Sequence, residues 1–131
     1  MVANLMTNTP ARDAFNNCVQ SIAGRITAVS GGPATQSVQI GTLPAGALIL
    51  GINTNVETAI TPGTATFNVG TTAAGTDLAA GIALTAGTVV TPVAAALANP
   101  LTADTQVWAN LAVSPTASDA FVTVQFIKPV S

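Results

Sequence analysis

Residues 37–50 read SVQIGTLPAGALIL and combine a strand pattern, a turn signal and the start of a second extended segment. Apolar and polar side chains alternate over residues 37–40, as they do along a strand with one buried face. Pro44 and Gly46 then mark a turn, because both residue types favour turn conformations. A second extended segment follows over residues 47–59, long enough for one long strand or two broken ones. Its inward-facing side chains are predicted to be Leu48, Leu50, Ile52 and Val56.

The segments at the two ends of this region also read as short strands separated by turns. Residues 25–29 alternate and are followed by Ser-Gly-Gly-Pro at 30–33, so we expect them to pair with residues 37–40. Near the C-terminus, residues 106–113 and 121–128 form two further alternating runs joined by a short polar segment. This arrangement predicts an antiparallel hairpin.

The middle of the chain is less regular. Residues 64–70 alternate, with Ala65, Phe67 and Val69 predicted on the core side. Residues 71–86 are rich in Gly, Ala and Thr without clean periodicity, which predicts a loop with one turn of helix at 77–80. Residues 88–91 read as a short strand.

Together these patterns give seven or eight strands and almost no helix. Regular short strands between turns favour an all-β fold, a single β-sandwich over residues 24–131, with the jelly roll as a candidate form. Val122, Val124 and Phe126 are predicted core residues. Trp108 alternates with its apolar neighbours, so its side chain is predicted on the opposite face of the strand. There it is either a covered core residue or an intersubunit contact.

Residues 1–23 differ in composition from the rest and are predicted to form an N-terminal arm or a short helix. They hold both methionines and the single cysteine, Cys18. Phe15, Val19 and Ile22 are spaced as on one face of a helix. The segment has no basic region followed by an apolar one, so we expect no secretion signal.

Composition excludes several kinds of partner. The chain has 131 residues, of which 49% are hydrophobic and 6% charged, and its net charge is -2. Three basic residues are too few to bind nucleic acid or anionic lipid electrostatically. Residues 78–103 carry no charge, but glycine and proline interrupt them, so we expect no membrane span. A surface this poor in charge favours assembly over a free monomer.

The sequence also argues against catalysis. It has no histidine, so the usual acid-base and metal-ligand side chain is missing. The five acidic residues are spread along the chain, and Gly70-Thr-Thr-Ala-Ala-Gly75 lacks the lysine of a phosphate-binding loop. We therefore expect a protein that is not an enzyme, with no metal and no cofactor. A glycan-binding module remains an alternative, although sugars usually stack on exposed aromatic rings, which are few here.

Several of these segments resemble small virion proteins of tailed bacteriophages, the capsid decoration or cement proteins. The similarity covers about residues 24–128, and its most specific parts are the LPAGA corner at 43–47 and the NVGT strand end at 68–71. It also includes the segments NTNVETA at 53–59, DTQVWA at 104–109 and FVTVQF at 121–126.

The resemblance implies a β-sandwich, commonly a homotrimer, that sits on the outside of the head and bridges major capsid subunits. It implies a virion location after assembly in the host cytoplasm. Under this hypothesis residues 1–23 reach the shell or an adjacent subunit, and Phe15, Val19 and Trp108 are the candidate interface residues. The alternatives are a helix packed on its own sandwich for residues 1–23, and a tail or fibre component for the whole chain.

Overall fold

The computed structural model describes residues 18–85, 87–91 and 100–128, which form eight strands and no helix. The strands are β1 (Gln20–Thr27), β2 (Gln36–Leu43), β3 (Leu48–Thr61), β4 (Thr66–Gly70), β5 (Ala79–Ile82), β6 (Gly87–Thr91), β7 (Thr105–Ala112) and β8 (Ala117–Ile127). The all-β prediction is therefore confirmed for this part of the chain, and the strand predicted at 88–91 is present as β6.

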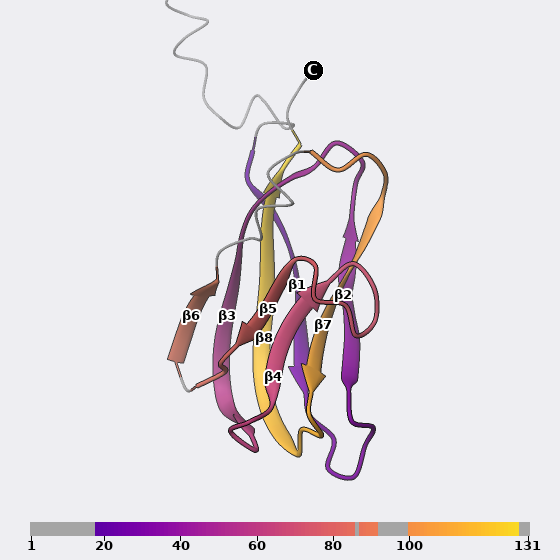
Figure 1. The fold of residues 1–131 in the computed structure, drawn as a ribbon. Helices are drawn as coiled ribbons and strands as arrows, with labels where there is room; N and C mark the ends of the chain where they lie inside the picture. The colour runs from indigo at the N-terminus through magenta and orange to yellow at the C-terminus, as the bar shows by residue number, and fades with distance from the viewer. Residues whose placement is uncertain (1–17, 86, 92–99, 129–131) are drawn as a thin grey trace, which may run out of the picture.

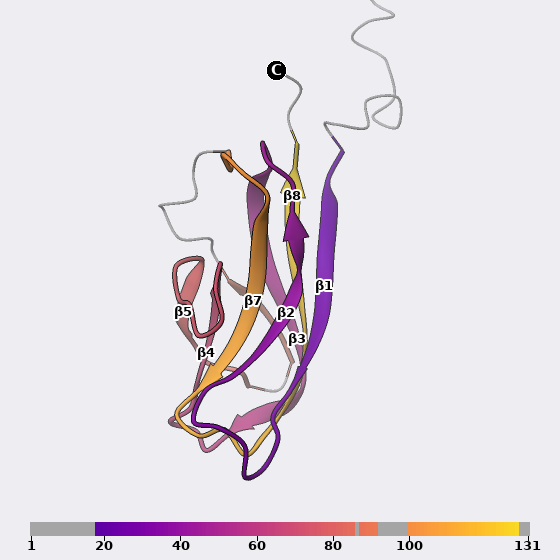
Figure 2. The ribbon, with the colours of Figure 1, turned by 90° about the vertical axis from the view of Figure 1, so that its right-hand side faces the viewer.

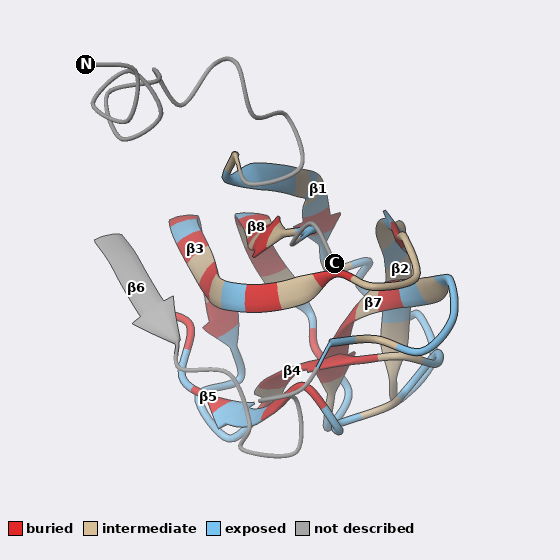
Figure 3. Cartoon of the chain, turned by 90° about the horizontal axis from the view of Figure 1, so that it is seen from above, coloured by how far each residue is buried: buried red, intermediate tan, exposed pale blue. Residues whose placement is uncertain are grey.

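The strands form two antiparallel four-stranded sheets that pack face to face (Figure 1). Sheet A has the order β1-β8-β3-β6, and sheet B has the order β2-β7-β4-β5. Seen from above, the two sheets are two separate layers (Figure 3). Every connection except that from β4 to β5 crosses from one sheet to the other, which gives the two interlocked Greek keys of a jelly roll. The β-sandwich prediction is confirmed.

Both predicted local strand pairings are wrong. β1 pairs with β8, and β2 pairs with β7, so residues 25–29 do not pair with residues 37–40. Likewise β7 and β8 lie in different sheets and do not form a hairpin. A glycine- and proline-rich connection suits a tight hairpin and a crossing between sheets equally well. Local sequence therefore identifies the turn without identifying the partner strand.

The predicted inward face of β3 is correct only in its second half. Ile52 and Val56 are buried, but Leu50 is 47% exposed and Leu48 is half-buried. The pairing with β8 shifts between Ile49 and Gly51, where a β-bulge inserts one extra residue. A bulge moves every preceding side chain to the other face, so Ile49 is buried where Leu48 and Leu50 had been expected.

Two further expectations are corrected at the strand boundaries. β5 occupies Ala79–Ile82, where the sequence predicted a loop with one turn of helix at 77–80. β1 begins at Gln20, so the helical spacing does not hold for residues 20–22, and the strand starts four residues before the predicted domain boundary. The rest of that proposed arm or helix, Phe15 included, lies outside the described residues.

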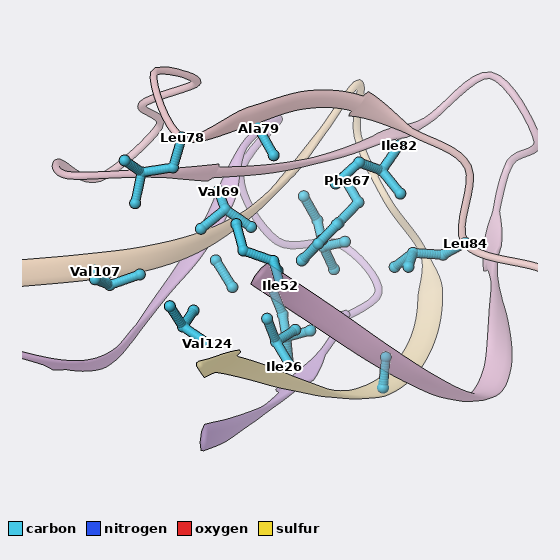
Figure 4. Packing of buried hydrophobic residues seen from close by; sticks show 14 of the residues in the cluster. Ile26, Ile52, Phe67, Val69, Leu78, Ala79, Ile82, Leu84, Val107 and Val124 are labelled. Atoms are coloured by element: carbon cyan, nitrogen blue, oxygen red, sulfur yellow. The ribbon is translucent and has the colours of Figure 1, made fainter. Parts of the chain in front are cut away.

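The core fills the space between the two sheets. Sheet A contributes Ile26, Ile52 and Val124, whose side chains point toward Phe67 and Val69 of sheet B (Figure 4). Outside β3, the side chains predicted to face the core are buried: Ala65, Phe67, Val69, Val122, Val124 and Phe126. Leu78 and Leu84, which flank β5, close the core beneath that short strand. This single continuous core holds the two outer faces and the connecting loops in fixed positions.

Candidate interaction surfaces

The structure places the predicted interface residues in different layers. Val19 immediately precedes β1 of sheet A and is exposed. Trp108 lies on β7 with its side chain on the outer face of sheet B, half-buried, so it is not part of the core between the sheets. Its indole Nε1 donates to Gln106 Oε1 at 3.3 Å. Its role as an intersubunit contact remains a prediction.

The outer face of sheet B is partly covered by the β4–β5 loop, residues 71–78. The Asn110 side chain, fully buried under this loop, donates from Nδ2 to the Gly75 carbonyl at 2.7 Å. Asn110 Oδ1 accepts from the Ala74 N–H at 3.0 Å, and Ser37 Oγ accepts from the same N–H at 3.1 Å. These bonds satisfy the polar atoms of the buried Asn110 side chain and tie the loop to β2 and β7, so the loop is an ordered part of this face.

Asp77 fixes the start of the same loop. Its carboxylate accepts from the Thr71 N–H at 2.8 Å and from Thr71 Oγ1 at 2.7 Å. Partial desolvation raises the pKa of Asp77, but these hydrogen bonds from Thr71 outweigh it and hold the pKa below its ordinary value. The ionised carboxylate therefore stabilises the fold. This contribution is complete above the unfolded-state pKa of about 3.9 and is lost as the pH falls through the folded-state value.

Replacing Asp77 with asparagine is expected to lower the free energy of unfolding by about 1 kcal/mol at pH 7, because charge-assisted hydrogen bonds to Thr71 become weaker neutral ones. The difference from the wild type should shrink toward pH 2, where the wild-type carboxyl is also uncharged. Urea denaturation at both pH values measures it. A difference of the same size at pH 2 would show that Asp77 does not act through its charge.

The outer face of sheet A carries a charged cluster built from three strands. Arg25 of β1 makes a two-pronged ion pair with Asp119 of β8, with Nε 2.7 Å from Oδ1. Its Nη2 also lies 3.3 Å from Oε2 of Glu57 on β3. The guanidinium carbon lies 5.4 Å from the centre of the Phe121 ring. The hydrogen bond from Arg25 lowers the pKa of Asp119, and the same bond raises the pKa of Arg25.

This cluster was not found from the sequence, which indicated only acidic residues spread along the chain. Glu57 and Asp119 are 32 and 94 residues from Arg25 along the chain, and the pairing of β8 with both β1 and β3 brings the three together. Phe121 could have been recognised by parity, because Val122, Val124 and Phe126 alternate with it and face the core. Alternation along the strand places the Phe121 ring on the outer face but does not reveal its charged neighbours.

Three loops gather at one end of the sandwich, the lower end in Figures 1 and 2. They are the β1–β2 loop (28–35), the β3–β4 turn (62–65) and the β7–β8 loop (113–116), and we call this region the loop end. The Ser114 N–H donates to the Ala34 carbonyl and the Thr116 N–H donates to the Thr61 carbonyl, both at 2.8 Å. Hydrogen bonds from the β7–β8 loop to the β1–β2 loop and to the last residue of β3 therefore hold this end together.

A small open hollow of about 280 Å³ lies between the β3–β4 turn and β5. Ile60, Ile82 and Leu84 supply much of its apolar wall, and threonines supply hydroxyl groups. None of its lining residues is ionisable. Within the described residues, no three His, Cys, Asp or Glu side chains are grouped to hold a metal ion. No described helix is long and apolar enough to cross a membrane.

Comparison with solved structures finds the same architecture in phage particles. A chain of the Cyanophage Pam1 capsid asymmetric unit is 21% identical, with a TM-score of 0.69 over 88% of each chain. The two chains share their fold. A chain from the capsid of Ralstonia phage GP4 is 20% identical, with a TM-score of 0.60, covering 87% of this chain and 86% of that one. No protein-family model and no curated protein sequence matches the chain.

Proposed function

We propose that this protein is a capsid decoration protein that binds the outer surface of a bacteriophage head and bridges major capsid subunits. The observation that carries the proposal is the likeness of its fold, over nearly the whole of both chains, to chains of two phage capsids. The role is mechanical: a clamp across neighbouring subunits stabilises the shell against the pressure of the packaged DNA without touching that DNA.

The described surfaces suit this role. Docking on a protein shell requires polar groups to lose water, and that loss costs most for charges. The chain carries eight charged residues in 131, and three of them are already paired with one another in the Arg25 cluster. The other groups on its outer faces are largely hydroxyls, amides and small apolar side chains, which can be covered at low cost.

The proposed unit is a homotrimer with no catalytic activity. Closed three-fold symmetry multiplies weak contacts with the shell, because the three copies bind together. Light scattering behind a sizing column tests this part of the proposal. A mass of three chains supports a preformed trimer, whereas a monomer at every concentration contradicts it.

Shell binding is tested by sedimenting the purified chain with empty heads assembled from the major capsid protein of the same virus. We expect the chain to sediment with the heads in a saturable ratio and to raise their thermal stability. Binding to purified tails and to a glycan array is measured in parallel, because these are the partners expected for the two alternative functions. Binding to tails or glycans with none to heads would overturn the proposal in favour of a tail component or a glycan-binding module.

Deleting residues 2–17 should leave a folded sandwich that binds heads at least roughly tenfold more weakly, a loss of about 1.4 kcal/mol. The deletion spares β1, which begins at Gln20, so thermal unfolding should be nearly unchanged. A variant with residues 2–17 scrambled controls for composition and should bind as weakly as the deletion. Undiminished binding by the deletion variant would show that the N-terminal segment is not an arm toward the shell.

A further inference from the structure

The loop end is a preordered surface. Besides the two backbone bonds already described, the Gln36 side chain joins two of the loops. Its Oε1 accepts from the Val29 N–H at 2.6 Å. Its Nε2 donates to the carbonyls of Val29 at 2.9 Å and Pro115 at 3.1 Å. Gly31, with a φ of 78°, occupies the turn position that needs a positive φ. A surface ordered in this way loses little conformational entropy when it binds a partner.

The loop end is also uncharged and unusually apolar for an exposed tip. Its three segments, residues 28–35, 62–65 and 113–116, contain no ionisable side chain. Val29 is 63% exposed and Val113 is 53% exposed, although loop tips normally carry small or polar residues. Of the five large apolar side chains that are exposed in the described residues, these two lie in the loops of this one end.

The backbone at Val113 gives a second, independent indication. Val113 has a φ of 67° and Ser114 a φ of 48°, so two consecutive residues are left-handed. A β-branched residue is a clear outlier in this region, because its side chain crowds its own backbone. Asparagine or glycine would fit with less strain. Strained residues of this kind concentrate at functional sites, where the surrounding structure holds them in place.

We propose that the loop end is the surface that docks on the phage shell, against an uncharged apolar patch of the major capsid subunits, with Val29 and Val113 as its anchors. The proposal rests on the proposed function. Charge complementarity favours an uncharged patch on the shell as the partner of this uncharged tip. A charged patch would lose its water on contact and find no opposite charge on the loop end to compensate.

The positions of the described charges agree with this docking direction. The Arg25 cluster lies beside the loop end on sheet A, since Asp119 pairs with Thr27, the last residue of β1. Interfaces commonly have an apolar centre and a polar rim, and the cluster is placed as such a rim. Asp104 and Lys128 lie at the opposite end, against the β2–β3 turn at Ala45 and Gly46.

The test compares two single variants, the double variant that combines them and a control variant, all in the full-length chain, for binding to empty heads. Val113→Asn removes the apolar anchor and relieves the left-handed strain, and Val29→Ser removes the second anchor. Leu50→Ser is the matched control, because Leu50 is similarly exposed, at 47%, but lies in the bulge near the other end of sheet A. We expect the double variant to bind heads roughly tenfold more weakly per chain, and Leu50→Ser to bind as the wild type does.

Three further results complete the test. Val113→Asn alone should unfold at the same temperature or higher, which separates docking from a structural role. Wild-type affinity should change less than about twofold between roughly 50 and 500 mM salt, since the centre of the contact is uncharged and the charges at its rim already pair with one another. A double variant that binds like the wild type, a steep salt dependence, or loss of the trimer mass in the double variant would each overturn the inference. Wild-type protein that fails to bind heads at all would instead overturn the proposed function.

Discussion

Replacing Phe67 with alanine is expected to lower the free energy of unfolding by about 4 kcal/mol, the largest loss among the single substitutions considered. Phe67 is fully buried on β4 and lies between the two sheets, facing Ile52 (Figure 4). Removing the ring takes away apolar burial and leaves a cavity that a closely packed sandwich fills only in part. Urea denaturation measures the loss.

The matched control is Phe121→Ala, the same substitution on the outer face of sheet A. Phe121 is 41% exposed, and its ring contacts the Arg25 guanidinium. We expect a loss of about 1 kcal/mol there, since less area is buried and no cavity forms. Equal losses at the two positions would contradict the assignment of Phe67 to the centre of the core.

Gly70→Ala is expected to cost about 3 kcal/mol, for a different physical reason. A Cβ at Gly70 would lie 2.4 Å from the Gly75 carbonyl carbon, inside the van der Waals distance, because the β4–β5 loop passes directly over this residue. The obstacle is backbone, which cannot move aside as a side chain can. The loop must therefore shift and lose its hydrogen bonds to Asn110.

Trp108 reports on that shift, because it is the single tryptophan and is paired with Gly70 across β7 and β4. Gly70→Ala should change its fluorescence and speed amide exchange at Ala74. Gly51→Ala is the control, since a Cβ there would meet nothing within 4 Å, and it should leave stability nearly unchanged. Indistinguishable stabilities of the two variants would show that the loop does not cover sheet B as described.

The positions of most strands could be predicted from the sequence, but their partners could not. Alternation over residues 64–70 and 121–128 revealed which side chains face the core, because that pattern depends on one strand alone. Pairing depends on residues far apart, such as Gln20 with Phe126. The bulge at Leu50 could not be predicted either. An extra residue changes which face of the sheet the side chains point to, but it leaves the composition of the strand unchanged.

The candidate surfaces show the same limit. Parity indicated that Trp108 differs from its neighbours, and the structure places it outside the core. The contacts of the loop end were not predictable, because they join residues such as Ala34 and Ser114, which are distant in sequence. The left-handed conformation of Val113 could not be predicted either, because valine rarely adopts a positive φ.

Under the proposed function this chain binds the outside of a phage head. The most direct measurement is a cryo-electron microscopy difference map of empty heads with and without the added chain. We predict extra density on the outer surface at the three-fold and quasi-three-fold positions, spanning neighbouring subunits, with the loop end toward the shell. Heads that gain no density, or gain it inside the shell or at the tail vertex alone, would contradict the account.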